Sequence, residues 1–504
     1  MKDIRLSMHL KKYHVPTVFT AGMLLSQILS VFQVYLSNLR HYEKIRLLYE
    51  NSYLPVPSLT VPERFTSLES AFWGGMFFCL TTGFGITFFS FSAARIWDRF
   101  FSRKKTALYP FLLFWTGCLL LISKNGFSPL VSLHFLLLPP PVFFLTLRFI
   151  PPVPGKSGRL ILLHIVCLAL LAVIAGKGMG AGTFSLIRDR LLLSHPAGLF
   201  FNNAYYRYTL YAAQVFKNLR QDQLKTCRIE NPDEIQNDLH LKQRLARYDY
   251  LTVPNGDKDI IDLVIRGQGK ELIFRHRGQE ILRCESAAFF RNTGDILKKF
   301  SRKTDRHVFF RSFTFISLLL ISGLTVWMLL WLPIRILCGF FAKAYPAAFF
   351  SPVLSFLTAV MLLIFWHPGK TENIPEKEMG RMLHSPRLEE RIRALQSIRR
   401  QKREIAPYGV HERMSRSPHI TERYYLIRAL SVSRSPDTYA VTLALADDPQ
   451  INVAYRAFHA LGARRDGRAV PEILERIQKS REWYIQMYAY KALRKLGWTQ
   501  KVSP

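Results

Sequence analysis

Long apolar runs alternate with polar, basic stretches over the first three quarters of the chain. A helix needs about 20 apolar residues to cross a bilayer. The runs 107–123 and 160–175 are short, and the run 127–147 contains three consecutive prolines, so these three segments are also compatible with re-entrant structure. The pattern predicts seven membrane spans, at residues 15–36, 71–94, 107–123, 127–147, 160–175, 312–332 and 347–366.

The spacing of these runs predicts the domain organisation. Five spans form a membrane domain over residues 1–175, and the last two form a hairpin over residues 312–366. Residues 176–311 between them read as a soluble region. We expect interfacial helices there, because aromatic residues gather at 200–216 and aromatic side chains favour the headgroup boundary.

A small α+β unit is expected to follow in the same region, because segments of β-type composition are bounded by turn signals such as Asn255-Gly256. These segments are 248–253, 260–266 and 271–274, and residues 279–283 are expected to pair with the last of them. After the hairpin, the polar residues 367–377 carry two prolines and read as a linker.

A helical pattern repeats over residues 378–504. Ile398, Leu430, Leu461 and Leu493 follow one another at intervals of 31 or 32 residues, and a small or apolar residue stands four positions before each. Such spacing places both positions on one face of a helix. We expect the repeat core to consist of Ala394, Ile398, Leu426, Leu430, Ala457, Leu461, Ala489 and Leu493.

The unit 447–477 is the clearest. Asp448-Pro449 stands at its start, Leu461-Gly462 at the end of its first helix, and Val470–Ile477 forms its second helix. This unit resembles a HEAT repeat of the short bacterial type, similar to those of phycobilisome-lyase-like proteins, and the resemblance covers about 378–498. It implies stacked helix pairs that bind a protein partner. The first unit departs from the pattern with a poor second helix, and no pigment-binding signature supports lyase-like activity.

The predicted fold is therefore mainly α: a polytopic α-helical membrane domain with a small α+β soluble insert and a C-terminal HEAT-like α-solenoid. Lys and Arg total 69 against 36 Asp and Glu, a net charge of +33. Beside apolar runs, this excess favours contact with the lipid bilayer and disfavours nucleic acid as a partner.

The side of the membrane is ambiguous. Basic residues near the N-terminus and at 95–105 favour the cytoplasm. Strict counting of seven spans then places residues 176–311 and the C-terminus outside. The basic cluster at 298–311 argues the opposite, and we favour the cytoplasmic side of a bacterial inner membrane for both soluble parts.

Two further residue sets are candidate surfaces. Ala71, Gly75, Cys79 and Gly83 recur every fourth residue, a spacing that lets another helix approach closely, within the chain or between copies, or reflects ordinary packing. In the repeats, a basic run suggests an anionic ligand, with anionic lipid as one candidate, or a solvated helix face. Its residues are Arg391, Arg399, Arg400 and Arg403.

The sequence indicates no catalytic residue, no cofactor and no metal site. The predicted spans contain no carboxylates, and the six cysteines form no CxxC pair, although Cys227 and Cys284 could pair in an oxidising compartment. A membrane scaffold or adaptor acting through the repeats is the favoured function. The alternatives are a subunit of an export or envelope-assembly complex and a membrane enzyme, for which Asp189, His240 and Asp249 are the polar residues to change first.

Overall fold

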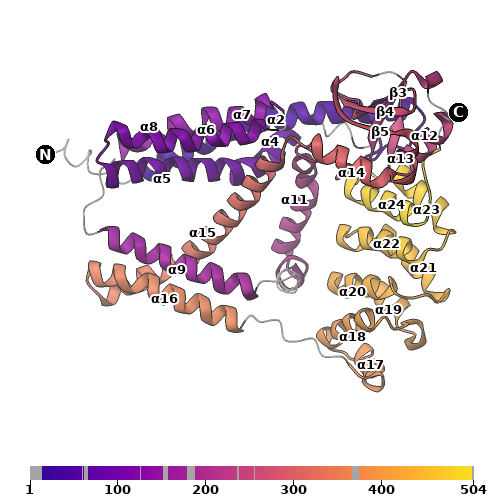
Figure 1. The fold of residues 1–504 in the computed structure, drawn as a ribbon. Helices are drawn as coiled ribbons and strands as arrows, with labels where there is room; N and C mark the ends of the chain where they lie inside the picture. The colour runs from indigo at the N-terminus through magenta and orange to yellow at the C-terminus, as the bar shows by residue number, and fades with distance from the viewer. Residues whose placement is uncertain are drawn as a thin grey trace. The chain divides into compact units, whose positions relative to one another are not determined.

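The computed structural model describes residues 14–501 except for 60, 62–65, 125, 151–156, 179–187, 235–237, 255 and 366–373. The first basic residues, Asn255 and most of the predicted linker 367–377 lie outside the described residues. The chain divides into two compact units, each built from three separate segments (Figure 1). The first unit contains residues 1–34, 71–184 and 305–368, and the second contains residues 35–70, 185–304 and 369–504.

Helices are the only regular secondary structure in the described residues of the first unit. Six helical runs are long and apolar enough to cross a membrane, and a shorter apolar stretch, 160–174, lies within α9. The elements are α2 (His14–Glu50, which continues into the second unit), α4 (Leu68–Phe78), η1 (Cys79–Gly83), α5 (Phe84–Phe101), η2 (Lys105–Leu108), α6 (Tyr109–Ser123), α7 (Pro129–Leu137), α8 (Pro139–Phe149), α9 (Ser157–Gly178), α15 (Val308–Phe341) and α16 (Ala344–Phe365).

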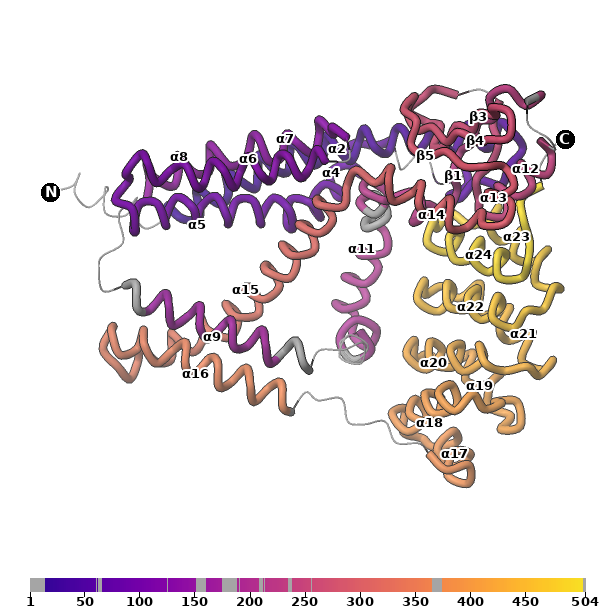
Figure 2. The backbone as a smooth tube through the Cα atoms, in the orientation of Figure 1, coloured from indigo at the N-terminus to yellow at the C-terminus, as the bar shows by residue number. Residues whose placement is uncertain are grey.

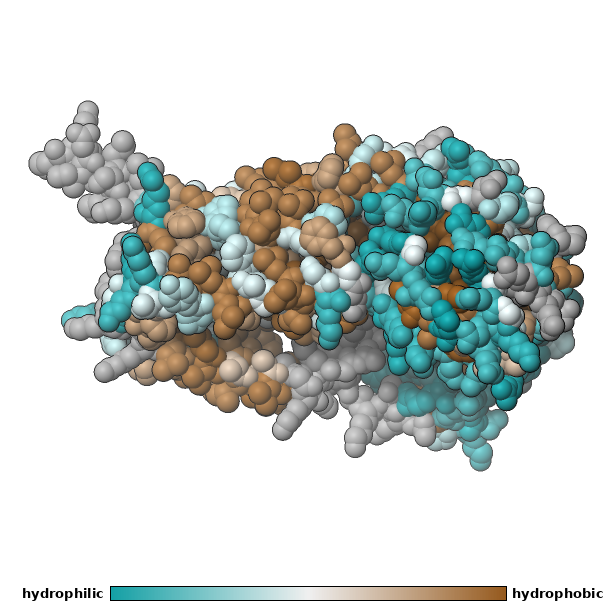
Figure 3. Space-filling view, turned by 45° about the horizontal axis from the view of Figure 1, so that its top comes forward, coloured by the Kyte–Doolittle hydropathy of each residue, from teal (hydrophilic) through white to brown (hydrophobic). Residues whose placement is uncertain are grey.

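Apolar side chains cover the outside of these helices. Phe114 and Leu329 are 71% and 70% exposed, and Figure 3 shows hydrophobic residues over much of the visible surface of this unit. A soluble surface rarely carries so much contiguous apolar area. Within the unit, α15 and α16 form a hairpin, and α9 lies beside α16 (Figure 2).

The second unit contains a five-stranded sheet in the order β2-β1-β3-β4-β5. β1 pairs in parallel with both β2 and β3, and the remaining pairs are antiparallel. The elements around the sheet are η3 (Arg188–Leu192), α11 (Pro196–Ala213), β1 (Lys225–Glu230), η4 (Pro232–Glu234), α12 (Asp238–Ala246), β2 (Tyr250–Thr252), β3 (Leu263–Gln268), β4 (Glu271–His276), β5 (Gln279–Glu285), α13 (Ser286–Arg291) and α14 (Thr293–Lys303).

The sheet explains why the two soluble cysteines stay apart. Cys227 lies on β1 and Cys284 on β5, two strands that β3 and β4 separate. Neighbouring strands are about 4.8 Å apart, so three spacings exceed the roughly 6 Å that a disulfide spans between Cα atoms. Both thiols are free, and the suggested pairing of Cys227 with Cys284 is wrong.

The rest of the second unit is a stack of helices in two layers. Helices α18, α20, α22 and α24 lie side by side, and α19, α21 and α23 form a second layer along one side of this row (Figure 1). The elements are α17 (Glu376–Leu383), α18 (Leu388–Gln401), η5 (Ala406–Tyr408), α19 (His411–Ser415), α20 (Ile420–Leu430), α21 (Asp437–Ala444), η6 (Leu445–Asp447), α22 (Ile451–Arg464), α23 (Ala469–Lys479) and α24 (Trp483–Lys495).

Gly462 does not end its helix, contrary to the sequence prediction. Helix α22 continues to Arg464, and Arg465 follows in the left-handed conformation at φ 56°. The glycine allows close packing instead, because a Cβ atom there would lie 2.9 Å from the Cα of Ala492 on α24. The small residue is required by the neighbouring repeat.

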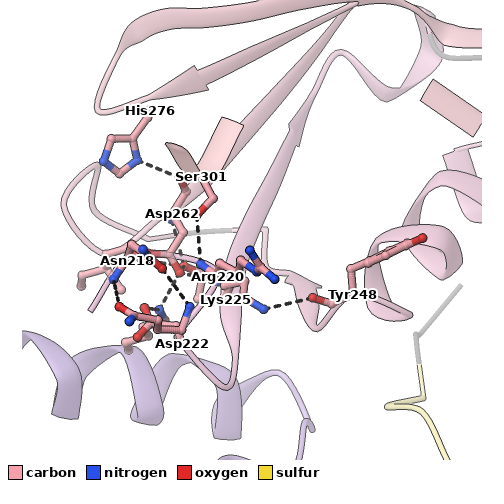
Figure 4. A network of polar contacts seen from close by, with 12 residues as sticks. Asn218, Arg220, Asp222, Lys225, Tyr248, Asp262, His276 and Ser301 are labelled. Carbon is pink, nitrogen blue, oxygen red and sulfur yellow. Dashed lines mark hydrogen bonds and ion pairs between the residues drawn. The ribbon is translucent and has the colours of Figure 1, made fainter. Parts of the chain in front are cut away.

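Three segments of the chain interlock in the second unit. At the end of α2, the Lys44 ammonium lies 2.5 Å from Asp262 and 3.5 Å from Asp222. The Asp262 carboxylate also accepts a 2.9 Å hydrogen bond from the backbone N–H of Thr226 on β1. Asp222 precedes β1 and Asp262 precedes β3 (Figure 4). These two strands are parallel, so their amino ends lie at the same end of the sheet.

The loop after α2 and the last repeat continue this interlock. Tyr53 donates a 2.9 Å hydrogen bond to the carbonyl of Thr252 on β2. The backbone N–H of Ser58 donates to Gln486 on α24 at 2.9 Å. Residues 35–59, the sheet and the helical repeats therefore form one folded body.

Candidate interaction surface

One face of the long repeat helices is lined by tyrosines: Tyr424 and Tyr425 on α20, Tyr455 on α22, and Tyr484 and Tyr488 on α24. We call these five residues the tyrosine face. The ring of Tyr455 lies 5.5 Å from that of Tyr484 and 4.7 Å from that of Tyr488, between centroids. The 31- and 32-residue register places them on equivalent turns of successive helices.

The chain itself covers much of this face: Tyr424, Tyr425 and Tyr455 are at most 6% exposed, and Tyr484 and Tyr488 are partly exposed. Arg188 donates a 2.7 Å hydrogen bond to the hydroxyl of Tyr424, and Tyr425 donates one to the carboxylate of Asp189. Asn202 of α11 donates to Asn452 at 2.8 Å, and the ring of Tyr206 lies 4.8 Å from that of Tyr484. Helix α11, in the region that the sequence predicted as interfacial, therefore contacts the repeats through Asn202 and Tyr206.

Cations lie among the tyrosines. The guanidinium of Arg428 is 5.2 Å from the ring of Tyr425, and that of Arg456 is 5.2 Å from the ring of Tyr455. Burial lowers the pKa of His459 to about 4, with Lys495, Arg456 and Arg399 adding to the effect. The imidazole is therefore neutral at physiological pH, and the arginines supply the positive charge.

The eight predicted repeat-core residues lie where the register places them. Each is fully buried in the core that the repeats share with the end of α2 and part of the sheet. They are Ala394, Ile398, Leu426, Leu430, Ala457, Leu461, Ala489 and Leu493.

The predicted basic run divides into two kinds of residue. Arg391 is bound to Glu422 of the next repeat at 2.6 Å, and its side chain is only 13% exposed. Arg423, one register later, binds Asp448 at 2.7 Å in the same way. Arg403 pairs with Glu376 at 2.6 Å. Arg399 and Arg400 are exposed, so the four arginines do not form a single open surface.

The row of small residues on the second predicted span faces α2. Ala71 is fully buried, and a Cβ on Gly75 would lie 2.8 Å from the backbone nitrogen of Val31. The Cys79 thiol donates to the carbonyl of Met23 at 3.2 Å, and a Cβ on Gly83 would overlap Ser26. These contacts lie within one chain.

The three polar residues proposed for an enzyme lie in separate surroundings. Asp189 contacts the tyrosine face, whereas Asp249 binds Arg494 at 3.1 Å and accepts a hydrogen bond from Tyr490 at 2.8 Å. The ring of His240 lies 4.9 Å from that of Phe290. Burial raises the pKa of Asp249, and the nearby Arg494 and Lys225 oppose that shift. These contacts give each residue a structural role.

Sequence inspection missed the polar cluster around Lys44. Its carboxylates, Asp222 and Asp262, are far apart in sequence and carry no motif. In Figure 4, Lys225 donates to the carbonyl of Tyr248 at 3.1 Å, and His276 lies 2.8 Å from the carbonyl oxygen of Asp262.

Over the described residues, no group of three or more His, Cys, Asp or Glu side chains is placed to hold a metal ion.

Comparison with known proteins identifies a family only for the repeats. No match was found among curated proteins or among solved structures. A family model described as HEAT repeats matches residues 409–494, from the end of η5 through most of α24. The HEAT-repeat resemblance predicted from the sequence is thereby confirmed for residues 409–494, and helices α19 to α23 with most of α24 form HEAT repeats.

Proposed function

We propose that this chain is a membrane-anchored scaffold that binds a protein partner through its HEAT repeats. HEAT repeats are a general protein-interaction module, and they match residues 409–494. The observation that carries the proposal is the tyrosine face. Tyrosine and arginine are enriched at the energetic centres of protein interfaces, and both line this face over three successive repeats.

The same reasoning accommodates the alternative of a subunit in an export or envelope-assembly complex, where the partner would be another component of that complex. The anchoring itself rests on six long apolar helical runs and on the exposed apolar surface around them. An enzyme remains the second alternative, and no arrangement of the described residues favours it.

A crosslinking experiment tests the scaffold. The tagged full-length chain is crosslinked in intact membranes and purified in mild detergent, and we expect one protein partner in stoichiometric amount. Tyr488→Ala on α24 should remove most of this partner. Tyr439→Ala is the matched control, because Tyr439 lies on α21 in the other helix layer. Absence of any crosslinked protein, or equal retention by both variants, would contradict the scaffold.

The three chain segments of the second unit restrict the number of membrane crossings between them. A folded unit lies on one side of a bilayer, and residues 35–70, 185–304 and 369–504 all belong to it. An even number of crossings must therefore separate these segments. Three long apolar helical runs and α9 stand between the first two segments, and α15 and α16 between the last two. We infer that α9 also crosses, which makes seven spans.

The short loops favour one orientation. Arg103, Lys104 and Lys105 lie between the second and third spans, on the same side as the basic N-terminus. Positive charge in short loops marks the cytoplasmic side, whereas long folded domains translocate largely regardless of charge. The cluster at 298–311 begins within α14, a helix of the folded second unit. We therefore propose that the second unit is extracytoplasmic, in place of the cytoplasmic side favoured by sequence inspection.

Cysteine labelling tests this orientation. Lys104→Cys, Lys270→Cys and Thr499→Cys place new thiols at exposed positions. A membrane-impermeant maleimide added to intact cells should label the second and third variants above the unsubstituted chain, and the first only after permeabilisation. Labelling of Lys270→Cys and Thr499→Cys from opposite sides would contradict the shared unit. If Lys270→Cys and Thr499→Cys were both labelled only after permeabilisation, the second unit would be cytoplasmic and the proposed orientation would be wrong.

A further inference from the structure

The cations on the tyrosine face have no carboxylate partner among the described residues. Arg428, Arg456, Lys491 and Lys495 form no ion pair there, and the Nε atoms of both arginines are buried without a hydrogen-bond acceptor. By contrast, Arg391 binds Glu422 and Arg423 binds Asp448, each a carboxylate of the next repeat. The Arg456 guanidinium donates hydrogen bonds to the hydroxyls of Tyr424 and Tyr455, which are neutral groups, so its positive charge has no counter-ion within the described residues.

The chain itself places one carboxylate on this face. Asp189 accepts hydrogen bonds from Tyr425 and, at 2.7 Å, from the Nε of Arg188. The guanidinium of Arg188 lies 4.2 Å from the centre of the Tyr424 ring. The Asp189 carboxylate of η3 is therefore held against α20 by the Tyr425 hydroxyl and by its own neighbour Arg188, which stacks on Tyr424.

The repeat register places cations and aromatic rings on α22 and α24 as well. Arg456 occupies the position equivalent to Tyr425, and His459 and Lys491 occupy those equivalent to Arg428. The Lys491 ammonium lies 5.0 Å from the ring of Tyr488. Donors and rings thus recur over the next two helices, where Asn202 and Tyr206 bring no negative charge.

We propose that the tyrosine face over α22 and α24 binds an acidic, extended segment of a protein partner, whose carboxylates pair with Arg456, Lys491 and Lys495. This inference rests on the proposed scaffold function. Packed helices lie about 8–10 Å apart, and an extended chain advances about 3.3 Å per residue. Acidic residues at about every third position would therefore meet successive helices.

Synthetic peptides test this surface with the full-length chain in phosphatidylcholine nanodiscs. The first probe is a fluorescent peptide of about twelve residues with glutamate at every third position and Ser or Gly between. The matched control has glutamine at the same positions. We expect the glutamate peptide to bind, the glutamine peptide not to bind, and binding to weaken with added salt as exposed charges are screened.

Variants assign the binding to the face. Arg456→Gln with Lys491→Gln should weaken binding by roughly tenfold or more. Arg468→Gln with Lys479→Gln removes the same charge from the other helix layer, where Arg468 stacks 4.8 Å from Tyr439 beside Asp466, and should leave binding unchanged. If the variant with Arg456→Gln fails to fold, the exposed pair Lys491→Gln with Lys495→Gln gives the same comparison.

Three outcomes would overturn the inference: equal binding of the glutamate and glutamine peptides, equal weakening by both variant pairs, or binding of phosphatidylglycerol vesicles through these cations with no peptide binding. In each case a crosslinked partner that still depends on Tyr488 would leave the scaffold intact. If no crosslinked partner depended on Tyr488 and the peptide still bound, the scaffold proposal would be contradicted.

Discussion

Replacing Lys44 with methionine is expected to lower the free energy of unfolding of the second unit by about 3–5 kcal/mol. The lysine side chain is 11% exposed, and its partners Asp262 and Asp222 are 15% and 22% exposed. Methionine preserves most of the side-chain length and removes the charge, so two largely buried carboxylates lose their counter-ion. Thermal or denaturant unfolding of the purified chain in detergent measures the difference.

A neighbour on the same helix provides the control. Arg46 pairs with Glu50, and these side chains are 64% and 53% exposed. Arg46→Met should change stability by less than about 1 kcal/mol, because an exposed ion pair contributes little. Adding Asp262→Asn to Lys44→Met should recover part of the loss, since one unpaired charge disappears. Equal effects of Lys44→Met and Arg46→Met would contradict the structural role of the cluster.

Replacing Gly75 with leucine is expected to destabilise the first unit by about 1–3 kcal/mol. A Cβ at this position would lie 2.8 Å from the backbone nitrogen of Val31 and 3.1 Å from its Cα. Backbone atoms cannot move aside as a flexible side chain does, so the helix pair of α2 and α4 must separate. Unfolding in detergent, followed by tryptophan fluorescence, measures the effect.

Gly117 provides the matched position on α6, because a Cβ there meets no atom within 4 Å. Gly117→Leu should leave stability within about 0.5 kcal/mol of the parent chain. The same pair of variants separates the two interpretations of the small-residue row. If Gly75 served contacts between copies, Gly75→Leu would change the oligomeric state and leave the unfolding of the single chain unaltered.

The helical repeats were the most predictable part of the fold. Their cores depend on apolar positions a few residues apart on one helix, and Ile398, Leu430, Leu461 and Leu493 are all fully buried as the register requires. Each unit repeats the same local pattern, so four copies of the signal reinforce one another. The function of Gly462 was mistaken, because a glycine near a helix end resembles a stop signal until the neighbouring helix is seen.

Strand β1, Lys225 to Glu230, was missed because its alternation is short: Cys227 and Ile229 are its only apolar residues, and charged or polar residues surround them. The strand is stable because β2 and β3 flank it on both sides and because Asp262 caps the N–H of Thr226. Parallel pairing joins segments that are distant in sequence, and no local pattern announces such a pairing.

The sequence by itself determined the apolar helices and the repeats, because hydrophobic length and helical period are properties of neighbouring residues. Tertiary structure alone decided which of the remaining polar residues act together. Lys44, Asp222 and Asp262 meet only because α2 and two parallel strands converge. Asp189 meets Tyr425 across 236 residues. Such contacts depend on the path of the whole chain, and a one-dimensional pattern does not record that path.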